Sequence, residues 1–355
     1  MTKLLDMARG CLLAGGVGDA LGYPVEFMSP SSIRSRYGAD GIRNLEVDLK
    51  TGSAVVSDDT QMTLFTANGL LLAAAHPGKR TPEAWIYAAY RDWLTTQEMW
   101  GWDESEKLCW LLDIPELYEL RAPGNTCLSG LRSGDMGSVD EPINNSKGCG
   151  GVMRVAPVAV HGYAMGWGAD KVIRLAAEAA AITHGHSLGW LSAAGLAGII
   201  YYILAGDAPD AAAYRCAEDL EYIYTGNGFA QRLCKDMLGA VALAQGDGSD
   251  EENINKLGEG WVGEEALYIA LYCAVRYMDD FDRCMTVSVN HRGDSDSTGA
   301  IAGNILGAYV GEQAIGEKWK TTLQFRTLLT DIADDLCAAE GERDAKWQER
   351  YCRGK

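Results

Sequence analysis

GDSDSTGAIAGN, residues 293–304, places two carboxylates and two hydroxyl side chains directly before a run of small and apolar residues. Asp and Ser are preferred helix N-cap residues, and a helix N-terminus stabilises negative charge. Taken alone, the stretch therefore predicts an acidic cap on a buried helix that ends near Gly311. The same oxygen ligands are also those that Mg²⁺, Mn²⁺ or Ca²⁺ prefer, so half of a cation site is the alternative.

A second acidic cluster, SDDTQM at residues 57–62, precedes another apolar helical pattern. Neighbouring side chains in a first helical turn point in different directions, so we expect that Asp58 and Asp59 do not both bury on one face. They can still converge on a cation at the helix N-terminus. Four carboxylates close to a core need cations, because a buried unpaired charge is costly.

The ligand types restrict the metal that such a site could hold. Hard oxygen ligands without a Cys or His cluster indicate Mg²⁺, Mn²⁺ or Ca²⁺ rather than zinc. An EF-hand calcium loop beginning at Asp294 is excluded, because its twelfth position would be Ile305 instead of Glu.

Working outward from these two stretches, most of the chain has helical periodicity, which predicts a single all-α domain over residues 1–355. The 42 glycines are spread along the chain, and within helices each costs up to ~1 kcal/mol unless close helix packing offsets the loss. The best candidate for a strand is Ile42 to Val47, and residues 121–152 form the longest predicted irregular stretch. We expect helices at 4–21, 58–75, 82–94, 170–182, 211–224, 230–244, 264–277, 280–289, 298–310 and 322–339.

Composition excludes several classes of protein. The net charge of -18 argues against nucleic-acid binding but leaves small anionic ligands open. Ten Cys without a C-x-x-C pair indicate reduced thiols and a cytoplasmic protein. The N-terminus lacks the apolar core of a signal peptide. Residues 187–206 are apolar and about long enough to span a bilayer, but without flanking basic residues they predict a buried core helix and no membrane association.

Two glycine-rich stretches and two further motifs complete the set of candidate site residues. Residues 14–27 end in Glu26, which is either a general base or a solvated loop acid. Residues 145–157 could cradle a phosphate with backbone N–H groups, although they lack the ending of a P-loop. His184 predicts a core or ligand-contacting residue rather than zinc, and Trp261 predicts a stacking or packing residue.

The order of these motifs resembles that of the ADP-ribosylglycohydrolase family, over about residues 7 to 311. The motifs are GDALG at 18–22 with Glu26, SDDTQM at 57–62, 148–154, THG at 183–185 and the stretch 293–303. The resemblance implies a compact orthogonal multi-helix bundle with two Mg²⁺ or Mn²⁺ ions. It implies that one metal is bound by Ser57, Asp58, Asp59 and Asp296, and the other by Asp294, Asp296 and Ser297. Ser57 stands where the family usually has Thr, and it keeps the hydroxyl ligand.

The same resemblance implies the substrate contacts. The loop from Ser146 to Met153 would surround the diphosphate and distal ribose. His184 would lie near the ADP-ribose, and Trp261 would lie near the adenosine. The implied contact residues are Ser146, Gly148, Cys149, Gly150, Gly151, Met153, His184 and Trp261. The residues that could accept the proton of the attacking water are Glu26, Asp59 and Asp294, and the sequence leaves this choice open.

The implied reaction is hydrolysis of the bond between C1″ of ADP-ribose and a side chain of an ADP-ribosylated protein, with ADP-ribose as product. Arginine-linked ADP-ribose is the preferred substrate, since an acidic rim suits a guanidinium leaving group. Serine-linked ADP-ribose is the main alternative. Two hypotheses from other classes are a non-catalytic ADP-ribose-binding relative and a metal-dependent phosphohydrolase of free nucleotides.

Overall fold

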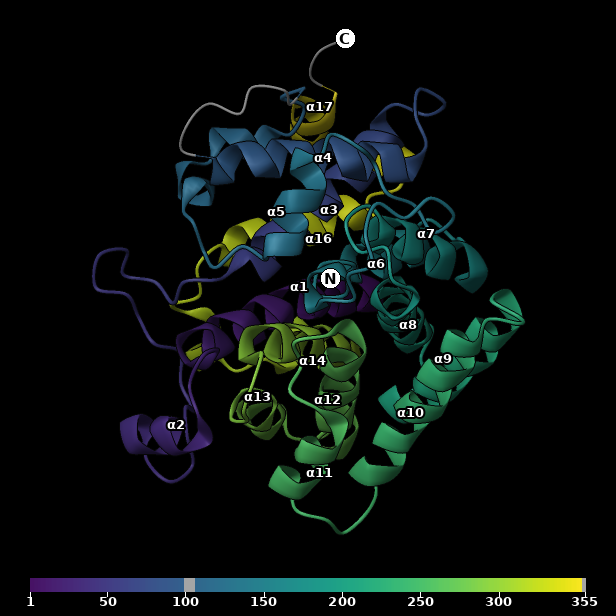
Figure 1. Ribbon diagram of the computed structural model, residues 1–355. Helices are drawn as coiled ribbons and strands as arrows, with labels where there is room; N and C mark the ends of the chain where they lie inside the picture. Colours follow the sequence, from purple (N-terminus) through teal and green to yellow (C-terminus); the bar gives the residue numbers. More distant parts are fainter. Residues whose placement is uncertain (99–105, 353–355) are drawn as a thin grey trace.

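The computed structural model describes residues 1–98 and 106–352, which form helices and no β-strand (Figure 1). Helices α1, α3 and α14 lie in the middle, α4 and α17 cover one side, and α9 to α13 cover the other. The helices are α1 (Lys3–Gly22), α2 (Pro30–Tyr37), α3 (Asp58–Ala75), α4 (Pro82–Gln97), α5 (Asn125–Arg132), α6 (Ala156–Ala164), α7 (Ala169–Ala181), α8 (Ser187–Leu204), α9 (Pro209–Ile223), α10 (Gly228–Ala244), α11 (Asp250–Leu257), α12 (Gly263–Arg276), α13 (Phe281–Val289), α14 (Ser295–Val310), α15 (Glu317–Lys320), α16 (Arg326–Cys337) and α17 (Ala345–Tyr351).

Short 3₁₀ turns connect several of these helices. They are η1 (Tyr23–Val25), η2 (Trp110–Asp113), η3 (Pro115–Tyr118), η4 (Cys149–Gly151), η5 (Glu312–Ala314) and η6 (Glu340–Glu342). The prediction of an all-α fold is confirmed, and the single-domain assignment over residues 1–355 stays a prediction.

The centre of the molecule is the pair α1 and α14, which pack backbone against backbone. A Cβ atom at Gly18 would lie 1.9 Å from the carbonyl oxygen of Gly299, and one at Gly22 would lie 2.2 Å from that of Ser295. No side chain fits into these gaps, so the glycines are required by the packing. The close contact offsets the helix-propensity loss that glycine causes. It also fixes the start of α14 against the end of α1.

The predicted helices are present, with ends displaced by a few residues. The strand predicted at Ile42–Val47 is wrong: these residues are irregular. The side chain of Asn290 takes the place of a partner strand, since its Oδ1 accepts from the Ile42 N–H and its Nδ2 donates to the Ile42 carbonyl, both at 2.8 Å. The predicted irregular stretch at 121–152 contains α5 and η4, so it is only partly irregular.

Helix α8 corresponds to the apolar run at 187–206. It is the one helix in the described part of the chain that is long and apolar enough to cross a bilayer, and 89% of that window is buried inside the protein. The expected core helix is thus present. All ten Cys are free in the structure.

Candidate active site

The two acidic helix starts meet in the interior. Asp58 and Asp59 begin α3, and Asp294 and Asp296 begin α14, and each of these four residues is at most 4% exposed. Asp58 and Asp59 are therefore both buried, although neighbouring side chains of a first helical turn point in different directions. The start of α3 is enclosed from several sides, by α1, α14 and the segment before α5, so different side-chain directions all end in buried space.

Glu26 completes the cluster from a third segment. Carboxylate oxygens of Glu26, Asp294 and Asp296 all lie within 4.8 Å of one another. Glu26 follows η1 directly after α1, so the close contact of Gly22 with Ser295 brings it next to α14. At 8% exposure it is a buried acid and not a solvated loop residue.

The acids of the cluster are only partly satisfied by the protein. Ser57 caps α3 by accepting from the Asp59 N–H at 3.1 Å, and Asp58 accepts from the Gly124 N–H at 3.1 Å. On α14, the Ser297 N–H lies 3.2 Å from Asp294 Oδ1 and 3.0 Å from Asp296 Oδ1.

Two carboxylate oxygens of the cluster, Glu26 Oε2 and Asp59 Oδ2, are buried and have no hydrogen-bond partner among the described residues. Buried acceptors without a donor are costly, so these two atoms mark where a bound group would be stabilised.

Burial and mutual repulsion raise the pKa values of these acids. Burial is the main cause for Glu26 and for Asp58, whose pKa values rise to about 8, and the neighbouring carboxylates add to it. The pKa values of Asp59 and Asp296 rise well above the usual range for the same reasons. A cation would remove this repulsion. Together with the two unpartnered oxygens, an all-oxygen donor set fits a hard divalent ion such as Mg²⁺ or Mn²⁺.

Asp19 is a supporting residue to which the sequence motif gave no role. It is fully buried in α1 and accepts hydrogen bonds from the N–H groups of Ser57 at 2.9 Å and Thr60 at 3.1 Å, and from the Thr60 hydroxyl. It thereby holds the start of α3 against α1. A single Asp in the otherwise apolar pattern of residues 10–22 is the signal that could have revealed it.

The glycine-rich loop lies beside the carboxylates. The hydroxyl of Ser297 is 4.0 Å from the sulfur of Met153. Burial, and after it the charges of Asp294 and Asp59, raise the pKa of the Cys149 thiol well above its ordinary value. The loop is anchored to the segment before α12, because the Cys149 N–H donates to the carbonyl of Trp261 at 3.3 Å. Loop and carboxylates thus form one continuous site.

The side chain of His184 packs against the glycines of this loop. It is 1% exposed, and its ring lies 3.2 to 3.4 Å from where Cβ atoms at Gly148, Gly150 and Gly151 would be. Larger residues at these positions would push the loop away from the ring. Burial lowers the pKa of His184 to about 3, so the ring is neutral. The structure therefore gives His184 a supporting position under the loop.

Arg154 was not among the predicted site residues, yet it fixes the end of the loop. It is fully buried, donates to the Thr183 hydroxyl at 2.8 Å and to the Ala179 carbonyl at 3.1 Å, and lies 4.2 Å from the ring centre of Tyr90. At the other end of the loop, the hydroxyl of Ser146 lies 3.0 Å from that of Thr126. These contacts fix the conformation of both ends of the loop in the absence of a ligand.

Two exposed aromatic rings border the cluster. Phe27, next to Glu26, is 77% exposed and stacks on Trp261 with ring centres 5.6 Å apart. Trp261 follows Gly260, where a Cβ atom would lie 3.3 Å from that of Asp294. The pair thus lies at the rim of the acidic site.

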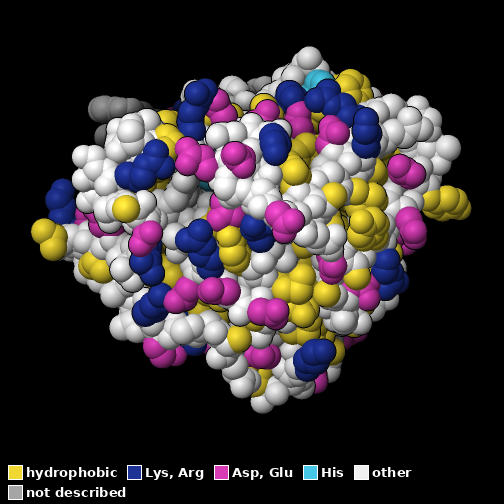
Figure 2. Space-filling view, turned by 90° about the horizontal axis from the view of Figure 1, so that it is seen from below, with side chains coloured by type: hydrophobic (Ala, Val, Ile, Leu, Met, Phe, Trp, Pro, Cys, Tyr) yellow, Lys and Arg dark blue, Asp and Glu magenta, His cyan; other side chains and the backbone are white. Residues whose placement is uncertain are grey.

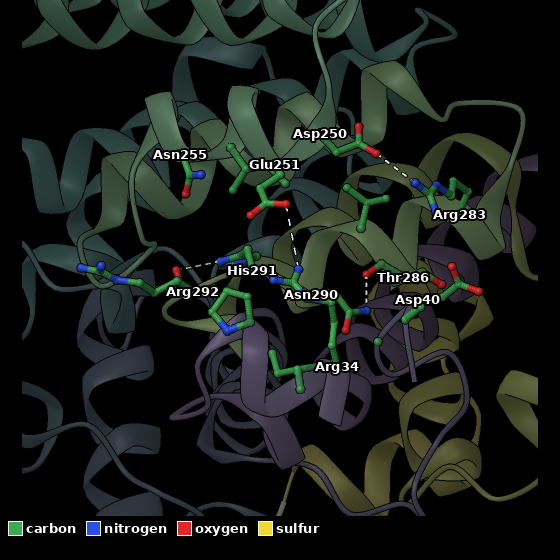
Figure 3. A pocket seen from close by; sticks show the side chains of 16 residues that line it. Arg34, Asp40, Asp250, Glu251, Asn255, Arg283, Thr286, Asn290, His291 and Arg292 are labelled. Atoms are coloured by element: carbon green, nitrogen blue, oxygen red, sulfur yellow. Dashed lines mark hydrogen bonds and ion pairs between the residues drawn. The ribbon is translucent and has the colours of Figure 1, made fainter. Parts of the chain in front are cut away.

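A separate cavity of about 210 Å³ lies between α2, α11 and α13 (Figure 3). Four of its ionic groups pair with one another: Arg283 lies 3.0 Å from Asp250, and Arg34 lies 3.9 Å from Glu251. Arg292 lines it, two residues before Asp294, but none of the clustered carboxylates does. It is therefore a different cavity from the acidic site.

Comparisons with known proteins identify the family of this chain. The family model described as ADP-ribosylglycohydrolase matches residues 1–346. The chain is 28% identical to ADP-ribosyl-[dinitrogen reductase] glycohydrolase of Rhodospirillum rubrum, covering 90% of this chain and 91% of that one. It is 25% identical to ADP-ribosylhydrolase ARH3 of Mus musculus, covering 91% and 88%.

A solved structure titled "ADP-ribosylglycohydrolase-related protein complex" shares the fold, with a TM-score of 0.67 at 23% identity over 95% of this chain and 99% of that chain. With a family match over nearly the whole chain, the protein belongs to the ADP-ribosylglycohydrolase family and is a hydrolase of the glycosidic bond of ADP-ribose.

Proposed function

We propose that this protein hydrolyses the N-glycosidic bond of ADP-ribosyl-arginine on proteins, with two Mg²⁺ or Mn²⁺ ions held by the clustered acids. The observation that carries the proposal is the meeting of α3, α14 and Glu26 beside a preformed glycine-rich loop. The proposed metal ligands are Ser57, Asp58, Asp59, Asp294, Asp296 and Ser297. Metals bound there would orient a water, lower its pKa and stabilise developing charge.

The protein's own residues would position the substrate. Of the N–H groups at the start of η4, that of Cys149 donates to the Trp261 carbonyl, which leaves those of Gly150 and Gly151 for a ligand. Such groups suit the diphosphate of an ADP-ribosyl group, which would lie along residues 146–153. The reacting ribose would then face the carboxylates, because Cys149 and Met153 lie next to them.

Glu26 is our candidate for the general base. Its Oε2 has no hydrogen-bond partner among the described residues, and its carboxylate lies within 4.8 Å of those of Asp294 and Asp296. It would take the proton of the attacking water while the hydroxyl adds to C1″. The bond from C1″ to the arginine nitrogen breaks, and the released guanidine gains a proton. Asp59 and Asp294 are the alternative bases.

The rim supports arginine as the linked side chain. A guanidinium is attracted to aromatic faces and to carboxylates, and Phe27, stacked on Trp261, lies next to Glu26. A serine hydroxyl carries no charge and makes no cation–π contact, so the same rim favours it less.

A linkage assay tests the proposal. Arginine-linked and serine-linked ADP-ribosyl peptides are incubated with the protein in Mg²⁺, Mn²⁺ or EDTA, and the products are identified by chromatography. We expect ADP-ribose from the arginine linkage only, loss of activity in EDTA, and loss in Asp294→Ala. Release from the serine linkage would assign the alternative substrate. Phosphate or AMP as product, no product, or release unaffected by EDTA would refute the proposal.

A further inference from the structure

A cleft between α10 and α12 lies at the other end of the glycine-rich loop from the carboxylates. It has a volume of about 570 Å³, and four cationic side chains line it: Lys147, Arg232, Lys235 and Lys256. Helices α10, α11 and α12 lie at one end of the molecule in Figure 1, and Figure 2 views the protein from that end, where basic side chains are interspersed among acidic ones. The concentration of cations in this cleft stands out in a chain of net charge -18.

Two of the four cations already have an anionic partner. Lys147 binds Glu264, and Arg232 lies 3.6 Å from Asp236.

The other two cations are free to bind an anion. Lys256 donates only to the neutral side chain of Asn253, at 3.3 Å, and Lys235 is exposed and forms no ion pair with a described residue. The remaining carboxylate of the cleft, Glu265, is occupied by the N–H groups of Glu259 and Gly260. The cleft therefore offers two ammonium groups.

The floor of the cleft carries polar groups that lack hydrogen-bond partners. Glu264 and Tyr268 are 3% and 5% exposed, and Glu264 Oε2 and the Tyr268 hydroxyl have no hydrogen-bond partner among the described residues. The two residues are four positions apart on α12 and so lie on the same face. An unpartnered buried polar group is costly, and a ligand with hydroxyl or amino groups would supply the missing hydrogen bonds.

The backbone connects this cleft to the candidate active site. The Gly263 N–H donates to the carbonyl of Lys147 at 2.8 Å, so the loop and the start of α12 are held together. Two residues further along the loop, Cys149 lies beside Asp294. A ligand that lies along residues 153 to 147 with its reacting ribose at the carboxylates therefore has its other end at this cleft.

We propose that the α10–α12 cleft binds a phosphate group, with the sugar that carries it, at the adenosine end of the substrate. Lys235 and Lys256 would bind the phosphate, and Glu264 and Tyr268 would bind hydroxyls of the sugar. The inference rests on the proposed function, since it takes an ADP-ribosyl group as the ligand. It extends the substrate class to ADP-ribosyl groups with an additional phosphate on the adenosine ribose. A free phosphorylated ligand would offer the same chemistry.

Calorimetric titration separates these sources without requiring turnover. The probes are ADP-ribose, ADP-ribose 2′-phosphate and inorganic phosphate. For the wild-type protein we expect the additional phosphate to tighten binding about 10-fold or more, as two charge-assisted contacts would. The Lys235→Gln/Lys256→Gln variant should lose this gain and bind ADP-ribose within about twofold of wild type. The exposed pair Lys3→Gln/Lys79→Gln, with the same charge loss, should keep the gain.

The floor has its own test. Tyr268→Phe removes a buried hydroxyl that has no partner, so it should raise the urea midpoint of the free protein while weakening binding of ADP-ribose 2′-phosphate about fivefold. A merely structural role for this hydroxyl predicts no loss of binding.

The outcomes are distinct. Equal affinities for ADP-ribose and its 2′-phosphate, together with no phosphate binding that depends on Lys235 and Lys256, would overturn the inference. Binding of inorganic phosphate that the double variant loses, without a 2′-phosphate gain, supports the site and assigns it to a free phosphorylated ligand. Failure to bind ADP-ribose at all would refute the proposed function, while the inorganic phosphate titration would still decide whether the cleft binds phosphate.

Discussion

Replacing one acid of the cluster should stabilise the protein in the absence of metal, and Asp58→Asn is the sharpest case. Asp58 is fully buried, and burial, with Asp19 and Asp294 nearby, raises its pKa to about 8. The change to Asn keeps the oxygen that accepts from the Gly124 N–H. It removes the negative charge and one candidate metal ligand. Stability and metal response should therefore change in opposite directions.

The magnitude follows from proton linkage. An Asp whose pKa is raised on folding binds a proton that the unfolded chain releases, so stability is lost as the pH rises from the ordinary value toward about 8. With an ordinary pKa of 3.8, the cost at pH 7 is about 4 kcal/mol, from about 1.4 kcal/mol per pH unit. The substitution removes this cost, but a buried amide with incomplete hydrogen bonding costs about 1–3 kcal/mol itself. We expect a net stabilisation of about 1–3 kcal/mol in EDTA.

Urea unfolding at pH 7, in EDTA and in Mn²⁺, measures both effects. Wild type should gain stability with Mn²⁺ concentration, as a ligand of the folded state does, and Asp58→Asn should gain much less. Asp92→Asn is the matched control: this buried Asp accepts three backbone N–H bonds, from Lys107, Leu108 and Cys109, so its replacement should destabilise and leave the metal response intact. A destabilised Asp58→Asn in EDTA, or an unchanged metal response, would refute the reasoning.

Three further perturbations test the packing, the pH response and the rim. Gly18→Ala should destabilise the protein by about 1–3 kcal/mol or more in urea unfolding, because its Cβ would lie 1.9 Å from the Gly299 carbonyl oxygen. Gly239→Ala in α10, where nothing lies within 4 Å of the new Cβ, should instead stabilise it by about 0.5–1 kcal/mol. Equal effects of the two substitutions would contradict the packing argument. Burial lowers the pKa of His161 to about 4, so its stabilisation is complete above its ordinary pKa of 6.5 and decreases as the pH falls toward 4, by about 3 kcal/mol in total. Urea midpoints at pH 7 and 5 should therefore differ less in His161→Gln than in wild type, and an identical difference would exclude this source. Phe27→Ala should raise KM for an arginine-linked peptide about 3–10-fold, as loss of a cation–π contact would, with Phe27→Tyr near wild type; unchanged KM in steady-state assays would remove Phe27 from substrate binding.

Local sequence determined the helices and the acidic caps. Ser57 and Asp294 are the N-caps of α3 and α14, because a cap needs only a short polar side chain within two or three residues of the helix start. The helical pattern follows from apolar spacing along the chain. The strand error at Ile42 has the complementary reason: a strand requires a partner, and here the partner is the side chain of a residue 248 positions away.

Residue patterns alone did not decide which of these elements meet: the family resemblance implied the meeting, and tertiary contacts produce it. Neither stretch indicates that the starts of α3 and α14 converge, since that depends on glycine contacts between α1 and α14 and on Asp19 bonding to Ser57 and Thr60. Glu26 was an ambiguous loop acid until the fold buried it beside Asp294.

The stretch at 293–304 shows the division most directly. Its sequence alone specifies a capped, buried helix with two carboxylates at its start. Whether those carboxylates form a site depends on what is packed opposite them, and here the opposite side holds three more buried acids, from α3 and from the turn after α1. Side-chain identity is local information, whereas repulsion between buried charges depends on their separation in space, which only the folded chain sets.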